Sequence, residues 1–327
     1  MKKFLSIMLA LALVLSLGTV AFAVEWDGTY TPTEAFTFQQ IDKTYVSENN
    51  VVVNETLKFT STPGSENPDN GVANLTVDDL TVTSLNPGKI TVNVPSLNKA
   101  GIYEWTIKET AGNTAGVTYS TAEIHVAVLV EYDNTNHALK IADTTSYIKK
   151  ENGEKANTFE NTFKSGSFTV AKNVEGNMAD VNDEFEITVT LTSEKPVGTN
   201  ITVAGETVTP DQWQGNTYTT TMEYSEIGGA KAFANIPEGV TVSVVENTAP
   251  EKMMNYSYTS TNDNQENGFT MTVADADENK EVVVTNTRTS TVDTGVFMDS
   301  LPYVLLLVGA CAGLVVFFAR RRMTHKG

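Results

Sequence analysis

The sequence predicts an all-β protein, with two tandem β-sandwiches between apolar segments at the two ends of the chain. Short runs rich in Val, Ile and Thr recur at roughly 8–12-residue spacing, and Gly, Pro, Asn and Asp separate them. No stretch between the ends carries a convincing apolar period of 3.6 residues, which argues against helices. The clearest strand-like runs are 51–53, 90–94, 103–107, 124–128 and 282–284.

The length of 327 residues suits two ordinary domains. We place a junction at Thr162–Gly166 (TFKSG). It divides the exported part into an N-terminal domain at 24–163 and a C-terminal domain at 164–290, both of ordinary domain size.

Residues 1–23 have the three parts of a secretory signal peptide. Lys2 and Lys3 form a positive start, an apolar stretch follows, and Ala21-Phe22-Ala23 is a small-x-small cleavage site. The alternative is an uncleaved N-terminal anchor. Either way, the sequence predicts an exported protein.

Residues 291–327 end in an apolar segment and a basic tail. Leu301–Ala319 is mostly apolar, and as a helix it would extend for about 28 Å, which is close to one hydrocarbon core. Arg320–Arg322 follows and should remain on the cytoplasmic side. The only cysteine, Cys311, lies within this membrane helix, so the exported domains have no disulfide.

The region between the two ends is strongly anionic. The termini hold six of the 22 bases and one of the 40 acids, which leaves 16 bases against 39 acids in 24–294. Such a surface argues against nucleic-acid binding, which needs Lys and Arg to replace condensed counterions. Three histidines and no cysteine cluster offer little for a transition-metal site, so we expect no metal and no cofactor.

The two halves repeat one order of polar residues: an early Lys, a middle Glu and a late Asn. On a β-strand, side chains at i and i ± 2 share a face, and at all six positions those neighbours are mostly apolar. Taken singly, each would be a solvated strand or turn residue. The same order on apolar faces in both halves instead favours burial. The six are Lys43, Glu109 and Asn161 in the first half and Lys172, Glu246 and Asn286 in the second.

A buried Lys, Glu and Asn can react with one another. Burial favours the neutral forms of both charged groups, which gives a nucleophilic amine and a carboxylic acid. The amine can attack the Asn carboxamide carbon while the Glu shuttles protons, ammonia leaves, and a Lys–Asn isopeptide bond remains. The sequence thus predicts two self-made cross-links, with Lys58 as the alternative to Lys43.

The chain resembles the sortase-assembled backbone (major) pilins of Gram-positive bacteria, of the T-antigen type, from about Phe36 to Arg322. The matching stretches are KAGIYEWTIKE, GVTYSTAEIHVAVLV, FTVAKNVEG, VVVTNT and TGVFMDSLPYVLLLV. The resemblance implies two immunoglobulin-like domains, each with a Lys–Asn bond and an assisting Glu. It also implies a structural shaft subunit rather than an enzyme, with sortase, identical subunits, minor pilins and peptidoglycan as partners.

The resemblance further implies a sorting signal and an acceptor lysine. Sortase would cut between Thr294 and Gly295, where Asp293 stands in place of the family's usual Pro. The acceptor lysine corresponds to Lys155, with Lys149 and Lys150 as alternatives.

Two other classes of protein compete with the shaft subunit. One is a monomeric, wall-anchored adhesin built from the same domains, but such proteins usually carry an added binding domain that this chain lacks. The other is a secreted enzyme, which is disfavoured because the sequence has no Ser-His-Asp signature.

Overall fold

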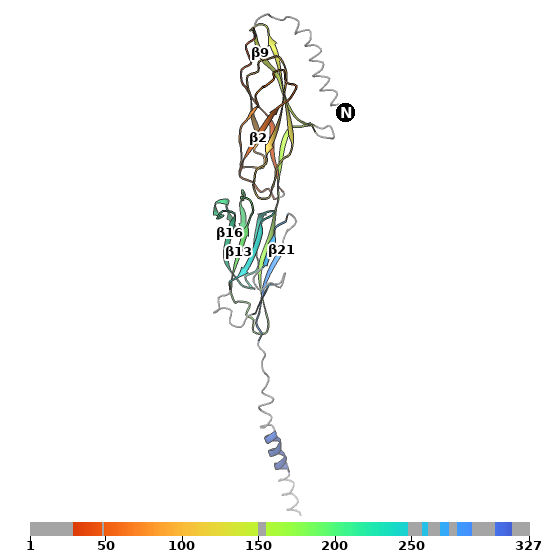
Figure 1. Ribbon diagram of the computed structural model, residues 1–327. Helices are drawn as coiled ribbons and strands as arrows, with labels where there is room; N and C mark the ends of the chain where they lie inside the picture. Colours follow the sequence, from red (N-terminus) through yellow and green to blue (C-terminus); the bar gives the residue numbers. More distant parts are fainter. Residues whose placement is uncertain are drawn as a thin grey trace, which may run out of the picture.

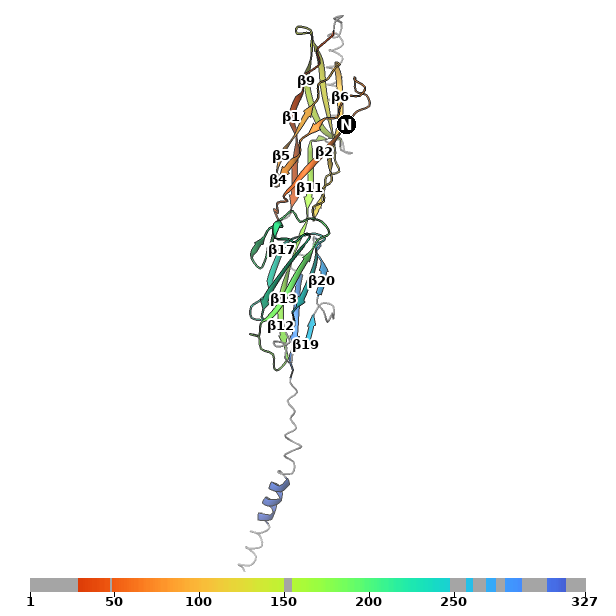
Figure 2. The same ribbon diagram turned by 60° about the vertical axis from the view of Figure 1, so that its left-hand side comes forward.

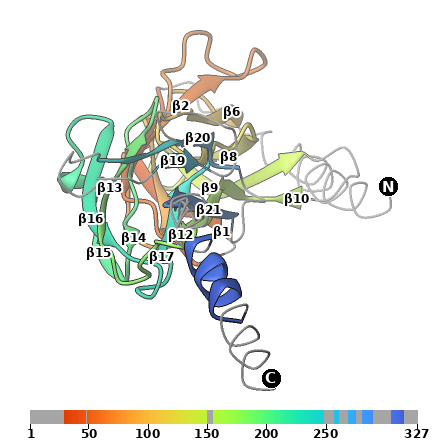
Figure 3. The same ribbon diagram turned by 90° about the horizontal axis from the view of Figure 1, so that it is seen from below.

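The computed structural model describes residues 29–47, 49–149, 155–247, 257–260, 269–274, 280–289 and 305–315. Within them the protein is all-β apart from a short 3₁₀ turn and one helical segment, as the sequence predicts. The strands form two sandwiches arranged end to end (Figures 1 and 2). Seen from below, the two sandwiches overlap in part (Figure 3).

The N-terminal sandwich packs two sheets, ordered β3-β5-β1-β11-β7 and β10-β9-β8-β6-β2-β4. The strands are β1 Phe36–Ser47, β2 Glu55–Pro63, β3 Thr76–Val77, β4 Leu80–Val82, β5 Gly88–Val94, β6 Gly101–Thr110, β7 Val117–Thr118, β8 Glu123–Asp133, β9 Ala138–Lys149, β10 Lys155–Ala156 and β11 Thr158–Phe163. Tyr103 and Trp105 of β6 stack within its core at a centroid distance of 5.9 Å.

The C-terminal sandwich also has two sheets, ordered β15-β14-β17-β12-β21-β19 and β16-β13-β18-β20. The elements are β12 Ser165–Glu175, β13 Phe185–Thr192, β14 Ile201–Val203, β15 Glu206–Val208, η1 Pro210–Gln212, β16 Thr217–Tyr224, β17 Lys231–Pro237, β18 Thr241–Glu246, β19 Ser257–Ser260, β20 Phe269–Thr272 and β21 Lys280–Thr287. Phe168 and Phe233 stack in its core at 4.6 Å.

In both sandwiches the first long strand is the parallel neighbour of the last. β1 pairs with β11 in the first domain, and β12 pairs with β21 in the second. A parallel pair needs a long crossover connection, and here the rest of each domain provides it. The beginning and the end of each domain are therefore side by side in one sheet.

The prediction of a strand at 51–53 is wrong. These residues form no strand, although Val51 and Val53 are buried in an apolar cluster with Leu57 and Phe163. The pattern of small β-branched residues thus reflects packing of a loop under the sandwich rather than a hydrogen-bonded ladder. The runs around 90–94, 103–107, 124–128 and 282–284 do lie in strands.

A short, hydrogen-bonded junction connects the two sandwiches. Lys164 alone separates β11 from β12, and its backbone N–H donates to the Gly116 carbonyl at 2.9 Å. The backbone of the first domain also meets the loop at 196–198 of the second, through Asn54 N–H to Gly198 O at 2.7 Å and Ala115 N–H to Pro196 O at 2.9 Å. These bonds tie the domains together at points other than the covalent connection.

Gly116 has a steric reason to be glycine at this junction. Its φ is +72°, and a Cβ there would lie 2.6 Å from the Lys164 carbonyl oxygen. A side chain would therefore strain the backbone and separate the two domains.

The expected signal peptide at 1–23 lies outside the described residues. A helical segment covers 305–315 within the expected span 301–319, and the other residues of that span also lie outside them. In the described part of the chain, no helix is long and apolar enough to cross a bilayer.

Candidate functional site

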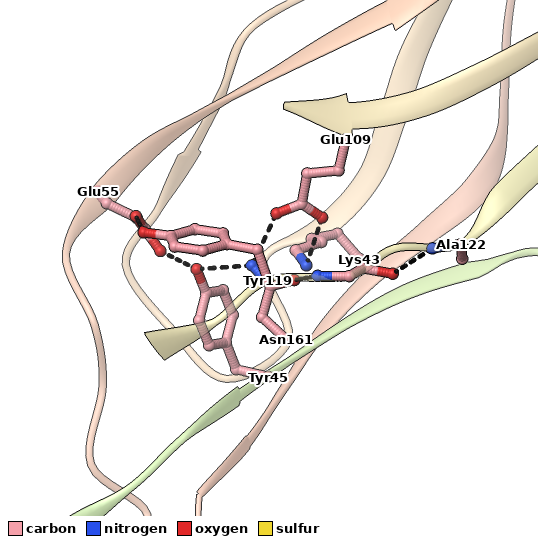
Figure 4. Close-up of polar contacts among 8 residues, drawn as sticks. Lys43, Tyr45, Glu55, Glu109, Tyr119, Ala122 and Asn161 are labelled. Atoms are coloured by element: carbon pink, nitrogen blue, oxygen red, sulfur yellow. Dashed lines mark hydrogen bonds and ion pairs between the residues drawn. The ribbon is translucent and has the colours of Figure 1, made fainter. Parts of the chain in front are cut away.

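The N-terminal domain buries Lys43, Glu109 and Asn161 against one another (Figure 4). The Lys43 Nζ donates to Glu109 Oε2 at 2.9 Å, and Asn161 Nδ2 donates to Glu109 Oε1 at 2.7 Å. One carboxylate therefore bridges the amine and the carboxamide. The side chains of Lys43 and Glu109 are both 0% exposed, and Asn161 is as deeply buried.

The alternation of β-strands brings these three groups together. Lys43 shares the buried face of β1 with Ile41 and Tyr45, and Asn161 lies on the buried face of the adjacent β11. Glu109 comes from the facing sheet, on the same side of β6 as Trp105. The reacting pair thus lies in one sheet, and the bridging carboxylate reaches it from the other.

The C-terminal domain repeats this arrangement. Lys172 Nζ donates to Glu246 Oε2 at 2.7 Å, and Asn286 Nδ2 donates to Glu246 Oε1 at 2.7 Å. Lys172 is on β12, Asn286 is on β21 of the same sheet, and Glu246 is on β18 of the other. The side chains of Lys172 and Glu246 are again both 0% exposed.

The strand register makes the two sites equivalent position by position. Asn161 is level with Tyr45, two residues after Lys43, and Asn286 is level with Val174, two residues after Lys172. The offset is therefore the same in both domains: each Lys precedes, by one position on the same strand face, the residue that is level with the Asn. We refer to these two sets of three residues as the N-terminal and C-terminal triads.

Burial changes the charge balance of both lysines. It lowers the pKa of Lys172 to about 8, although the nearby Glu246 favours the charged form. Burial also lowers the pKa of Lys43, against the opposing effect of Glu109 and, more weakly, of Glu55 and Glu160. Both amines are therefore easier to deprotonate than an exposed lysine, which a nucleophile requires.

The N-terminal triad has neighbours that the sequence analysis missed. The backbone N–H of Ser120 donates to Asn161 Oδ1 at 2.9 Å, and Asn161 Nδ2 also donates to the Tyr45 hydroxyl at 3.1 Å. Tyr45 in turn donates to Glu55. The sequence does place Tyr45 on the same strand face as Lys43. Strand alternation alone, however, does not show that the Tyr45 hydroxyl reaches Asn161.

The other residues singled out from the sequence lie away from the triads or outside the described part. Lys58, the alternative nucleophile, is exposed on β2 opposite Thr110. Lys155 of β10 is the backbone pairing partner of Lys149 of β9, and the structure describes only the backbone of these two residues. Lys150, Asp293, Thr294 and Gly295 all lie outside the described residues.

The described residues contain no group of three His, Cys, Asp or Glu side chains arranged to hold a metal ion. Neither triad includes a cofactor-binding group, because each consists of an amine, a carboxyl and a carboxamide already hydrogen-bonded to one another. Each triad thus brings an amine, a carboxyl and a carboxamide into direct contact.

Comparison with known proteins places this geometry in a family. The crystal structure of the major pilin from Streptococcus pyogenes aligns with a TM-score of 0.53 and 18% identity, over 79% of this chain and 99% of that one. The major pilin T3.2 of a second S. pyogenes serotype aligns with a TM-score of 0.51 and 20% identity, over 78% and 97%. At such identities the similarity establishes the fold.

The family match is in the N-terminal domain. Residues 19–164 match the Spy0128-like isopeptide containing domain. The N-terminal domain therefore belongs to this domain family. Residues 166–288 match a domain of unknown function, DUF7601, and none of the curated proteins matches the chain.

Proposed function

We propose that this protein is a pilin, the shaft subunit of a covalent, sortase-polymerised pilus, and that each domain forms an autocatalytic Lys–Asn isopeptide bond. The observation that carries the proposal is the bridging glutamate. In both domains one buried carboxyl contacts the lysine amine with one oxygen and the asparagine amide with the other. Two unrelated structural ion pairs would not be expected to share this arrangement and the same strand register.

The reaction follows from these contacts. A proton moves from Lys43 to Glu109, and the neutral Nζ attacks Asn161 Cγ to give a tetrahedral intermediate. The second proton lost by Nζ passes to Nδ2, which Glu109 also contacts, and Nδ2 leaves as ammonia. The proton held by Glu109 then leaves with the ammonia as ammonium. One N–C bond forms, one breaks, and the carboxylate is regenerated in its starting form. Lys172, Glu246 and Asn286 would react in the same way.

The position of the bonds suits a protein under tension. Each bond would join the first long strand of a domain to the last, and these strands are parallel neighbours. Force entering at one end and leaving at the other would then pass through a covalent link instead of ladder hydrogen bonds, which contribute only about 0.5–1.5 kcal/mol each. The end-to-end arrangement and the bonded junction at Lys164 give the shaft its continuity (Figure 2).

Assembly of the shaft is proposed to use the terminal segments. The signal peptide at 1–23 directs export, and the helix at 301–319 with its Arg tail retains the precursor at the membrane. Sortase cuts between Thr294 and Gly295 and joins the Thr294 carboxyl to Lys155 of the next identical subunit, with Lys149 and Lys150 as alternative acceptors. A head-to-tail contact of this kind produces an open filament. Minor pilins and peptidoglycan are the proposed further partners.

Intact mass spectrometry of residues 24–293 tests the isopeptide bonds. We expect the wild-type chain to lack the mass of two ammonia molecules. Glu109→Ala and Glu246→Ala should each restore one ammonia, and the double variant should restore both. Lys58→Ala, which removes an exposed lysine of the first domain, is the matched control and should keep both bonds. A wild-type chain of full, uncorrected mass would refute the bonds and leave polymerisation supported by the terminal segment alone.

Polymerisation is tested separately, by expressing the full chain with a pilin-assembling sortase and looking for a ladder of covalent oligomers. Lys155→Arg should abolish the ladder, whereas Lys149→Arg and Lys150→Arg should leave it intact. A ladder that persists in Lys155→Arg and disappears in one of the other two variants would move the acceptor to that lysine. A wild-type chain that never forms a ladder would contradict the shaft assignment.

A further inference from the structure

A second polar cluster adjoins the N-terminal triad, built around the carboxylate of Glu55 on β2 (Figure 4). The hydroxyl of Tyr119 donates to Glu55 Oε2 at 2.6 Å, and the Thr114 hydroxyl donates to the same oxygen at 2.9 Å. The other oxygen accepts from the Tyr45 hydroxyl. With three hydroxyl donors directed at it, the Glu55 side chain acts as an acceptor only, as an ionised carboxylate does.

These contacts fix the direction of the Tyr45 hydroxyl group. Its proton points to Glu55, so the lone pair of its oxygen is available to Asn161 Nδ2, 3.1 Å away. Burial, and next the hydrogen bond with Glu55, raise the pKa of Tyr45 above its ordinary value. The group therefore remains a neutral hydroxyl and retains this donor-and-acceptor arrangement.

The same contacts fix the orientation of the Asn161 carboxamide. Its oxygen faces the backbone N–H of Ser120, while its nitrogen lies between Glu109 Oε1 and the Tyr45 hydroxyl. If the triad reacts as proposed above, Nδ2 is the leaving group. It acquires positive charge as it is protonated, because an amine leaves a tetrahedral intermediate as ammonia only after gaining a proton.

We propose that Tyr45 is a catalytic residue for the N-terminal isopeptide bond and that Glu55 is its positioning residue; this inference rests on the proposed function. As Nδ2 becomes –NH3+, the Tyr45 oxygen accepts a hydrogen bond from one of its N–H groups and stabilises the developing positive charge. The negative charge of Glu55 behind the hydroxyl strengthens that acceptor, since hydrogen bonds to ionised groups polarise their neighbours. No atom of Tyr45 or Glu55 is consumed: Nζ–Cγ forms, Cγ–Nδ2 breaks, and the protons move through Glu109.

The C-terminal triad provides a natural comparison. The position equivalent to Tyr45 is Val174, which is level with Asn286 in the same parallel register and carries no hydroxyl. The C-terminal triad therefore has no hydroxyl at this register position. Removal of this hydroxyl should slow one bond and leave the other bond unchanged within a single molecule.

The test measures how fast each bond forms in newly made chains. Residues 24–293 are synthesised in a cell-free system, translation is stopped, and samples are acid-quenched over time. Proteolytic digestion and mass spectrometry then give the fraction of Asn161 and of Asn286 that is cross-linked. For Tyr45→Phe we expect the N-terminal bond to form about tenfold to a hundredfold more slowly, the effect of losing one oriented group from a charged transition state. The C-terminal bond in the same chains should keep its wild-type rate.

Glu55→Gln, with Lys58→Ala as its control, separates chemistry from folding. Glu55→Gln retains the Tyr45 ring and hydroxyl but removes the charge behind it, and should slow only the N-terminal bond, by less than Tyr45→Phe does. Lys58→Ala removes an exposed side chain from β2, the strand that carries Glu55, and should stay within about twofold of wild type. Protease resistance of the quenched samples reports the folded fraction, so that rates are compared for folded chains.

The outcomes distinguish this inference from the proposed function. A wild-type chain that forms no N-terminal bond refutes the proposed function itself. If the wild type forms the bond and folded Tyr45→Phe forms it equally fast, only the catalytic role of Tyr45 is overturned. If Tyr45→Phe does not fold, the Glu55→Gln rate decides: an unchanged N-terminal rate overturns the inference, and selective slowing supports it.

Discussion

The N-terminal and C-terminal triads have the same three residues, the same strand register and the same bridging carboxylate, but different surroundings. In the first, Asn161 also contacts Tyr45 and the backbone of Ser120. In the second, Val174 takes the place of Tyr45, and Lys172 Nζ lies 4.2 Å from the ring centroid of Phe185. The shared part is the minimum that the proposed chemistry needs, so the surroundings can differ.

The two lysines also differ in electrostatics. Around Lys43, the charges of Glu55 and Glu160 add to that of Glu109 in favouring the protonated amine. For Lys172 the opposing effect comes from Glu246, and burial brings its pKa to about 8. The two domains therefore surround the same three residues with different charges and different side chains.

The largest effect is expected from removing the bonds. Asn161→Ala and Asn286→Ala each leave the Lys–Glu pair in place but prevent cross-linking. The proposed bonds would close loops of 118 residue steps (43 to 161) and 114 residue steps (172 to 286). By the loop-entropy model, each variant should lower the free energy of unfolding of its own domain by about 4–5 kcal/mol. Hydrogen exchange measured by mass spectrometry resolves the two domains.

Because the loops are nearly equal, the two losses should also be nearly equal. Lys58→Ala is again the control, since that side chain is exposed. A loss in only one domain would mean that only one triad reacts, which would end the equivalence of the two sites.

A smaller effect, dependent on pH, should appear in the uncross-linked Asn286→Ala variant. The folded-state pKa of Lys172 is about 8, below its ordinary value of 10.5. Between these values the unfolded chain binds more protons, so stability should rise with pH from about 8 to about 10.5, and the full penalty applies below pH 8. We expect a gain of about 1–3 kcal/mol in urea denaturation relative to the control Asn286→Ala/Lys172→Met.

The wild-type chain should lack this gain, because the isopeptide nitrogen no longer titrates. Equal pH dependence in Asn286→Ala and its Lys172→Met control would show that burial of Lys172 does not determine its charge.

The smallest effect concerns the ring beside Lys172. In Asn286→Ala near neutral pH, Phe185→Leu removes a cation–π contact as well as packing, and the contact contributes about 0.5–2 kcal/mol. In the cross-linked protein the nitrogen is an uncharged amide, so only the packing loss should remain. A double-mutant cycle in chemical denaturation measures the difference. Identical losses in both backgrounds would show that the ring only packs against Lys172 and does not stabilise its charge.

Strand alternation in the sequence was enough to find both triads and the faces on which they lie. Lys43 between Ile41 and Tyr45, and Glu109 after Trp105 and Ile107, predict burial because a strand repeats every two residues. The same reasoning failed at 51–53, where buried valines pack in a loop. Alternation reports which side chains are buried and does not reveal whether the backbone has a ladder partner.

The sequence by itself determined the all-β class, the two domains, and the repeated order of Lys, Glu and Asn, since these depend on local periodicity and composition. Tertiary structure decided that one carboxylate bridges the Lys and the Asn of each triad. It decided too that β1 lies parallel to β11, and β12 to β21. It also decided that Tyr45, Glu55 and Ser120 reach Asn161 or its neighbours. These contacts join residues far apart in the chain, and their geometry follows from how two sheets pack, which no local pattern specifies.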